Sequence, residues 1–175
     1  GTPEMNLDCG PVVNPTQQQR VNRFIEQAQA SGLPVLAQGQ IDPGVPADGY
    51  YVTPTFFGAV PPDHPLAHQE VFGPVLAAMP FTDEAHAIAL ANGTDYGLGG
   101  VCYGETAHAT AVADRVRTGF IWVNSFGIRD LAAPFGGIKR SGVGREGGDW
   151  SFEFFCDIKD VVVPKKPFRA SFSHR

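Results

Sequence analysis

The glycine-rich stretch at 136–148, GGIKRSGVGREGG, is the first candidate for ligand binding. Gly142, Gly144 and Gly147 form a literal GxGxxG, which in dinucleotide-binding proteins lets a turn approach a pyrophosphate. That fingerprint needs a strand directly before it and an acidic residue about 20 residues later. Polar residues precede the glycines here, and no strand–helix–strand unit follows. A phosphate loop of the GxxxxGK type fails too, because Lys139 does not follow a glycine. The stretch therefore predicts a sharply turning loop that approaches other backbone closely.

Three cysteines are the next reactive side chains. Cys9, Cys102 and Cys156 are far apart, form no CxxC pair and have no histidine at a zinc-binding spacing. We therefore expect neither a disulfide nor a metal site. None has a neighbouring base or an identified helix N-terminus that would lower its pKa, so all three are predicted to be inert. An independent thiol enzyme that uses Cys102 is kept as an alternative.

Two longer segments are more specific, namely HQEVFGPV at 68–75 and WVNSFGIRDLAAPFGGIKRSGVGREGG at 122–148. The first resembles the ExFGP motif of the aldehyde dehydrogenase superfamily, and the second resembles its PFGGxKxSGxGRE motif. DCGPVVN at 8–14, ANGTDYGLGG at 91–100 and the final run IKDVVVP are similar to further segments of the same family, in the same order. The resemblance covers nearly all of the chain.

The resemblance assigns roles to four residues. It implies that Glu70 holds the ribose hydroxyls next to the nicotinamide of NAD or NADP, which suits a carboxylate because it accepts from two vicinal hydroxyls at once. It implies that Phe72 packs near the nicotinamide ring. Asn124 would sit near the catalytic centre, and Phe135 would line the substrate tunnel. Without the family, Glu70 is a surface carboxylate, Asn124 a turn former and Phe135 a core residue.

Arg129 is the residue that bears on the substrate. Arg-Asp-Leu before Pro-Phe-Gly-Gly resembles the hydroxymuconic and 5-carboxymethyl-2-hydroxymuconic semialdehyde dehydrogenases of aromatic catabolism, whose substrates carry carboxylates. A guanidinium offers planar, bidentate donors to a carboxylate, so Arg129 is expected to anchor the end of the substrate remote from the aldehyde. The alternative is a local ion pair with Asp130 or another acidic residue.

The residues that would perform the reaction are not in this sequence. In the superfamily the nucleophilic cysteine, the oxyanion-hole asparagine, the general-base glutamate and the cofactor domain all lie upstream of the point where the chain begins. We therefore expect no catalytic residue here, a fragment that is inactive by itself, and an intact enzyme that oxidises an aldehyde with NAD or NADP. The alternative is an interaction module of the same fold with no catalytic role, because the final run suits addition to a neighbour's sheet.

An amphipathic helix and a strand are expected in the first third of the chain. Residues 15–31 carry apolar side chains at helical spacing, namely Val21, Phe24, Ile25 and Ala28. A short apolar run follows at 34–37. Residues 50–60 have the composition of a strand, but Pro54 cannot donate to a ladder, so an edge strand or a bent strand is predicted.

From residue 75 onward, helical and strand patterns alternate. Strands are predicted at 75–81, 98–103 and 120–124, and helices at 83–91 and 106–117. Asp83 and Thr106 are the expected N-caps. A stripe faces the sheet from the second helix, formed by Ala109, Val112, Ala113 and Val116. The fold class is therefore α/β, with a parallel-dominated sheet flanked by helices. By resemblance, it is the later half of a dehydrogenase catalytic domain plus an oligomerisation strand.

We divide the chain into a partial catalytic domain at 1–156, an oligomerisation strand at 157–164 and a polar tail at 165–175. The strand implies a homo-oligomer. The net charge of −5 gives no reason to expect nucleic acid or an anionic membrane as partner. No apolar run approaches the roughly 18 residues that a membrane span needs. We therefore expect a soluble, cytoplasmic protein.

Overall fold

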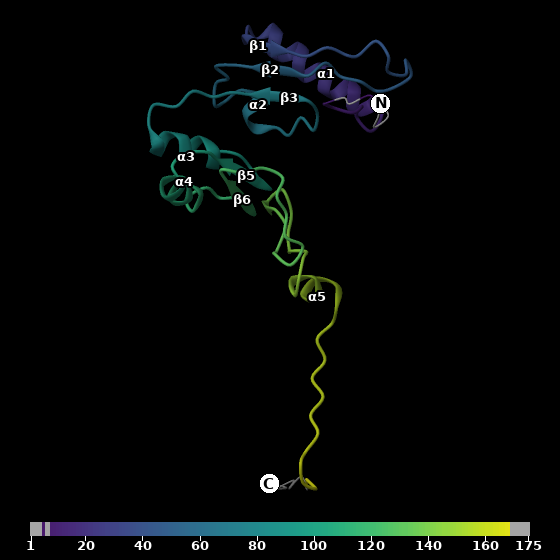
Figure 1. Cartoon of the computed structure of the whole chain (residues 1–175), viewed down its shortest axis with the longest axis vertical. Helices are drawn as coiled ribbons and strands as arrows, with labels where there is room; N and C mark the ends of the chain where they lie inside the picture. Colours follow the sequence, from purple (N-terminus) through teal and green to yellow (C-terminus); the bar gives the residue numbers. More distant parts are fainter. Residues whose placement is uncertain (1–4, 6–7, 169–175) are drawn as a thin grey trace, which may run out of the picture.

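The computed structural model describes residues 5 and 8–168, and two groups of elements follow one another along the chain. Figure 1 shows the first group, with the long helix α1, the short helix α2 and strands β1 to β3, above the second, with α3, α4, β5 and β6. A long loop, a short helix and an extended segment follow the second group. Both groups combine helices with sheets, as the α/β prediction requires.

The first group is held together by one face of α1 (Pro15–Ala30). The Asn14 side chain caps this helix by accepting from the backbone N–H of Gln17 at 2.8 Å. The core that α1 forms with the strands and α2 (Pro65–His68) consists of Val21, Phe24, Ile25, Ala28, Val52, Phe57, Val60 and Leu66. The four core residues from α1 are the four that the helical spacing predicts, so this helix and its buried face are confirmed.

The sheet of the first group corrects the prediction for residues 50–60. Its order is β1 (Val35–Gln38), β2 (Thr55–Phe57) and β3 (Val75–Ala77), so β2 is the central strand and the expected edge position is wrong. β2 pairs with β1 antiparallel and with β3 parallel. Pro54 is tolerated because it lies just before the strand, where only its carbonyl is used, as the acceptor for the Gly39 N–H at 2.8 Å.

The second group follows the predicted alternation closely. α3 (Glu84–Asn92) leads to β5 (Gly99–Cys102), α4 (Thr106–Ala113) and β6 (Phe120–Val123). β5 and β6 pair in parallel over their whole length, and α4, which connects them, packs on both strands. The α/β class is confirmed, although the strands form three short sheets rather than one.

One predicted cap is confirmed and one is wrong. The Asp83 carboxylate accepts from the His86 backbone N–H at 2.8 Å and caps α3. α4 is capped by Glu105, whose two carboxylate oxygens accept from the backbone N–H groups of Ala107 and His108 at 3.0 and 2.9 Å. Thr106, the predicted cap, is instead the first residue of the helix. A glutamate at this position escaped prediction because Ser, Thr, Asp and Asn are the usual cap residues.

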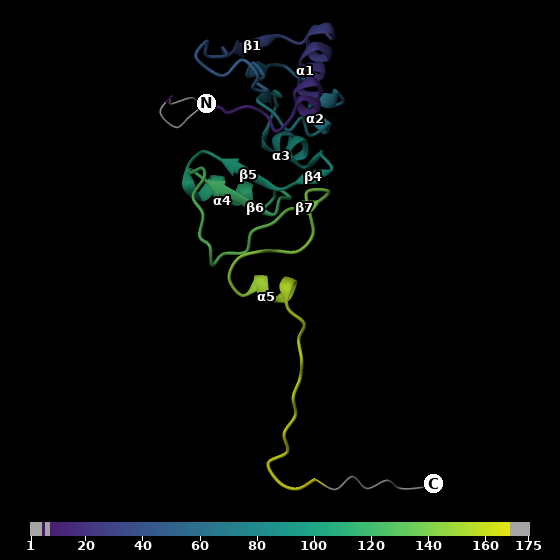
Figure 2. The same ribbon diagram turned by 90° about the vertical axis from the view of Figure 1, so that its right-hand side faces the viewer.

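The chain leaves the second group through an irregular loop and then the short helix α5 (Trp150–Phe155). Beyond α5 the described chain runs as an extended segment away from the rest of the molecule, as Figure 2 shows. Its apolar side chains are exposed, and Ile158 retains 94% of its accessible surface. The run 157–164 forms no ladder with any other described residue, and its predicted role between subunits remains a prediction. Of the predicted polar tail, 169–175 lie outside the described residues.

Candidate functional site

Glu70 and Phe72 lie in the loop between α2 and β3. Phe72 has a φ of 56°, in the left-handed region that a bulky residue rarely adopts, and its side chain is 72% exposed. Glu70 is also exposed. A strained backbone persists only where the surroundings hold it, so the loop requires a specific support.

That support comes from α1. The Gln17 side-chain amide donates to the carbonyls of both Val71 and Phe72 at 2.9 Å. The Arg20 guanidinium donates to the Val71 carbonyl at 2.8 Å. Sequence reasoning missed both residues, although one signal was available. Gln17 precedes the buried Val21 by four residues and Arg20 precedes the buried Phe24 by four residues, so they extend the buried face of the helix with polar side chains.

The Glu70 carboxylate has the chemistry that a ribose requires. Within the described residues it forms no hydrogen bond or ion pair, so its oxygens are available to accept from two hydroxyls. The exposed Phe72 ring lies two residues away on the same loop and offers an apolar face for a planar ring. These two side chains therefore fit a nicotinamide ribonucleoside, which is what NAD and NADP share.

Asn124 follows β6 in the left-handed conformation, with a φ of 50°. Its side chain accepts from the Gly104 N–H at 2.9 Å and donates to the Gly104 carbonyl at 2.9 Å. It also donates to the Thr106 hydroxyl at 3.3 Å. The amide thus holds the turn between β5 and α4, and these contacts support the turn-former interpretation of Asn124.

Backbone hydrogen bonds hold the glycine-rich loop together. Phe135 and Glu146 exchange both backbone hydrogen bonds, at 2.7 and 2.8 Å. β7 (Ile138–Lys139) pairs antiparallel with β4 (Tyr96–Gly97), which joins this loop to the ANGTDYGLGG segment. A Cβ on Gly119 would lie 1.7 Å from the Gly136 carbonyl oxygen. The prediction of close backbone approach is therefore confirmed, and no strand–turn–helix for a pyrophosphate is formed by residues 136–148.

Arg129 has two partners within this loop. Its guanidinium forms an ion pair with Glu146 at 2.7 Å, and it lies over the ring of Phe135, 3.9 Å from the ring centroid. The anticipated local ion pair is thus present, with Glu146 rather than Asp130. Phe135 continues into an aromatic row, in which neighbouring ring centroids are 4.8 to 5.3 Å apart, formed by Phe120, Trp122 and Phe126.

Four of the five predicted site residues form two separate groups, and Asn124 instead contacts Gly104 and Thr106. Arg129 and Phe135 are in contact, whereas Glu70 and Phe72 share the loop before β3 beside the first sheet. Across the described ranges, no hydrogen bond, ion pair or ring contact joins one group to the other.

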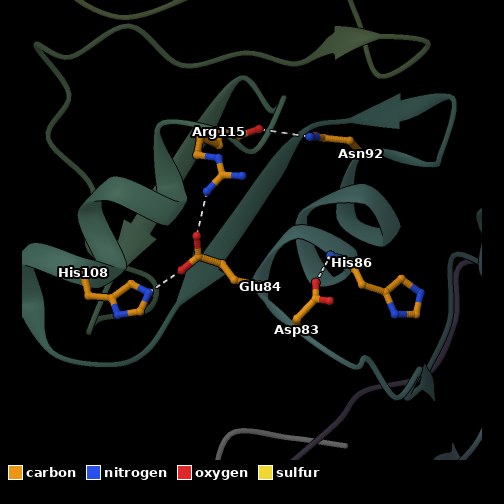
Figure 3. A network of polar contacts seen from close by, with 6 residues as sticks. All are labelled: Asp83, Glu84, His86, Asn92, His108 and Arg115. Atoms are coloured by element: carbon orange, nitrogen blue, oxygen red, sulfur yellow. Dashed lines mark hydrogen bonds and ion pairs between the residues drawn. The ribbon is translucent and has the colours of Figure 1, made fainter.

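A polar network joins α3 to α4 (Figure 3). The Glu84 carboxylate binds Arg115 at 2.6 Å and the His108 ring through its other oxygen. The hydrogen bond from His108 has the largest effect on the pKa of Glu84 and lowers it, whereas desolvation, which ranks second, raises it. The charges of His108 and Arg115 and the hydrogen bond from Arg115 lower this pKa further, and the net shift is downward. The backbone N–H groups of His108 and Ala107 likewise lower the pKa of Glu105.

The remaining candidates give no second site. Cys102 lines a pocket between α3, α4 and β5, but in the described part of the chain no base is hydrogen-bonded to its thiol. A search of the described residues finds no group of His, Cys, Asp or Glu arranged to hold a metal ion. The same residues include no helix long and apolar enough to cross a membrane.

Comparison with known proteins agrees with the family resemblance that the sequence motifs indicate. The model of the aldehyde dehydrogenase family matches residues 1–161. Betaine aldehyde dehydrogenase from Rhizobium leguminosarum is 38% identical over 164 residues, which are 93% of this chain and 34% of that protein. The chain therefore spans about a third of the length of the curated relatives it matches.

Solved structures show the same likeness. A Mycobacterium tuberculosis aldehyde dehydrogenase complexed with NAD⁺ is 34% identical, with a TM-score of 0.80 over 91% of this chain and 33% of that chain. Aldehyde dehydrogenase C from Pseudomonas syringae, a C291A mutant with NAD⁺ and octanal, is 37% identical, with a TM-score of 0.74 over 82% of this chain and 30% of that one. The sequence motifs, the fold and the family match lead to one conclusion, that this chain belongs to the aldehyde dehydrogenase family.

Proposed function

We propose that the protein containing this chain oxidises an aldehyde to its acid with NAD or NADP, and that this segment supplies cofactor-contacting and substrate-lining groups. The cofactor, when bound, accepts the hydride. Glu70 binds the ribose hydroxyls beside the nicotinamide, and Phe72 packs against that ring. The observation that carries the proposal is the exposed Glu70–Phe72 loop, held in a strained conformation by side chains from α1.

Replacement of Glu70 by Gln in the protein containing this chain tests the cofactor role. The amide keeps the size of the side chain but loses one acceptor, so the nicotinamide ribose is held less firmly. A misplacement of about 1 Å can cost on the order of a hundredfold in rate, so we expect single-turnover hydride transfer to slow by roughly ten- to a hundredfold. Glu26→Gln is the matched control, because Glu26 is also an exposed carboxylate but lies on α1 and not in this loop. Unchanged cofactor affinity and unchanged hydride transfer in Glu70→Gln would contradict the proposal.

The proposed substrate is a semialdehyde that carries a carboxylate, of the kind found in aromatic catabolism. Arg129 supports this choice. Its guanidinium has five donor hydrogens, and the ion pair with Glu146 occupies one edge of it through a single nitrogen. The side chain of Arg129 is 43% exposed, which leaves it accessible to an anionic ligand. A substrate carboxylate would then compete with Glu146 or bind beside it.

Betaine aldehyde is the second candidate, because the curated relatives are named for it. Its quaternary ammonium would favour an open aromatic face. The row of Phe120, Trp122, Phe126 and Phe135 offers such faces, but Arg129 already covers the ring of Phe135 at 3.9 Å. A cation at that place would also be repelled by the guanidinium. This contact is the reason for ranking the anionic substrate first.

A further inference from the structure

We infer that Gln17 and Arg20 are positioning residues that clamp the Val71–Phe72 backbone and thereby aim Glu70 and Phe72 at the cofactor. The inference rests on the proposed function of Glu70. Neither residue need touch the cofactor for this role, because both act through the main chain of the loop.

The clamp directs its donors to two consecutive carbonyls of the loop. The Gln17 amide has two N–H groups, and the structure gives one to the Val71 carbonyl and one to the Phe72 carbonyl, both at 2.9 Å. The Val71 carbonyl accepts a second hydrogen bond from Arg20 at 2.8 Å. A charged donor makes this bond the stronger one. The Arg20 guanidinium is itself steadied by stacking over the Phe24 ring, 5.0 Å from its centroid.

The clamp acts where the backbone is least favourable. Phe72 is held at a φ of 56°, in a sparsely populated region that a non-glycine residue adopts only at a cost in free energy. Immediately after it, a Cβ on Gly73 would lie 2.5 Å from the fully buried Val21 side chain, so the loop is also pressed against α1. Without the clamp, Phe72 would relax to an ordinary conformation, and its exposed ring and the neighbouring Glu70 would both turn away.

The experiment compares three variants of the protein containing this chain, Gln17→Leu, Arg20→Leu and the conservative Arg20→Lys. Gln18→Leu is the matched control, because Gln18 lies next to Gln17 and donates at 2.8 Å to a different carbonyl, that of Tyr51. We measure hydrogen exchange of the peptide covering 69–76 and single-turnover hydride transfer. Both Leu variants should exchange faster in that peptide and transfer hydride roughly ten- to a hundredfold more slowly, with little change in KM for the aldehyde. Arg20→Lys should retain most of both properties.

Two results would overturn the inference. One is exchange of 69–76 in both Leu variants that equals that of Gln18→Leu, since the loop would then be held by something else. The other is a pair of Leu variants in which 69–76 exchanges faster but hydride transfer is unaltered, although Glu70→Gln transfers hydride slowly. The order of the loop would then not control hydride transfer. Failure of the proposed function is recognised separately. In that case Glu70→Gln would leave cofactor affinity and hydride transfer unchanged, whereas the exchange measurement reports the clamp directly.

Discussion

The Arg129 guanidinium makes an ion pair and an aromatic contact, and we propose that it also binds a substrate carboxylate. Replacement by Ala in the protein containing this chain removes all three. Hydrogen bonds to charged groups contribute about 1.5–3 kcal/mol each, so loss of one or two should lower kcat/KM for a carboxylated semialdehyde by about ten- to several-thousandfold. A neutral aldehyde should lose far less. Steady-state kinetics with both substrate types make this measurement.

The comparison needs a control for loss of charge alone. Arg140 is an exposed arginine whose only ion pair in the described residues is a long one, 3.7 Å to Asp95, and whose guanidinium lies 5.8 Å from the centroid of the Tyr96 ring. Arg140→Ala therefore removes the same charge together with two weak contacts. Equal losses for carboxylated and neutral aldehydes in Arg129→Ala would show that Arg129 holds the loop through Glu146 and Phe135. A gain with betaine aldehyde in the same variant would favour the cationic substrate, because the Phe135 face is then uncovered.

Gly119 makes a second prediction at the residue scale. A methyl group there would lie 1.7 Å from the Gly136 carbonyl oxygen, so backbone must move. Overpacking typically costs about 1–3 kcal/mol, and Gly119→Ala should lower the free energy of unfolding by at least that much in urea denaturation. Gly10→Ala is the control, because nothing lies within 4 Å of its added Cβ. Equal denaturation midpoints for the two variants would contradict the close approach of Gly136 to Gly119.

At this scale, the sequence could predict a residue's role when the residues that define the role are contiguous in the chain. Glu70 and Phe72 could be proposed from their motif, because the motif itself is contiguous. Gln17 and Arg20 were missed because their partners, the carbonyls of residues 71 and 72, are more than 50 positions away and carry no side-chain identity. The Arg129 ion pair was anticipated in kind, but its partner Glu146 is reached only because the loop folds back.

At the scale of elements, one carboxylate joins α3 to α4, beside the hydrogen bonds that Asn92 makes with the backbone of Arg115 and Arg117. Glu84 begins α3 and binds His108 on α4 and Arg115 just beyond it. Because its pKa is lowered in the folded protein, chiefly by the hydrogen bond from His108, the folded state binds a proton there less readily than the unfolded chain. The stabilisation is therefore present above the ordinary glutamate pKa of 4.5 and is lost as the pH falls through the lowered value.

Thermal unfolding between pH 7 and pH 3 tests this link. The protein should melt at a higher temperature than Glu84→Gln near neutral pH, and the difference should shrink as the pH falls below 4.5. Glu105 has its pKa lowered in the same direction by its cap hydrogen bonds, so Glu105→Gln is a useful comparison that disturbs the start of α4 without touching Glu84. A difference for Glu84→Gln that stays constant from pH 7 to pH 3 would rule out titration of Glu84 as its cause.

The sequence could locate those helices and strands whose apolar residues repeat over at least one full helical or strand period. The face of α1 and the order β3, α3, β5, α4, β6 follow from runs long enough to show helical or strand spacing. β2 was misplaced at an edge because Pro54 was counted inside the strand, whereas the ladder begins at Thr55. β4 and β7 escaped notice, since two-residue strands have no period and are fixed by the fold of the glycine-rich loop.

At the scale of the whole molecule, the extended C-terminal segment has apolar side chains that are exposed and pack against no other described element. Val161, Val162 and Val163 retain 69%, 80% and 77% of their accessible surface. Consecutive valines favour a strand, and an isolated strand is stable only when its backbone pairs with a sheet. We propose, as the sequence resemblance implies, that 157–164 pairs with a neighbouring subunit and makes the protein a homo-oligomer.

Proline scanning tests that pairing without removing the apolar surface. In a strand, alternate N–H groups point to the same neighbour, so one of the adjacent variants Val162→Pro and Val163→Pro must delete a ladder hydrogen bond on the paired side. We expect at least one of them to shift the protein toward smaller species in sedimentation velocity at micromolar concentration. Val162→Thr keeps both the N–H and the strand preference and should sediment like the unaltered protein. Lys165→Pro, just outside the predicted strand, should also be silent. If neither valine variant dissociates the oligomer, or if the unaltered protein is a monomer, subunit pairing through 157–164 is wrong.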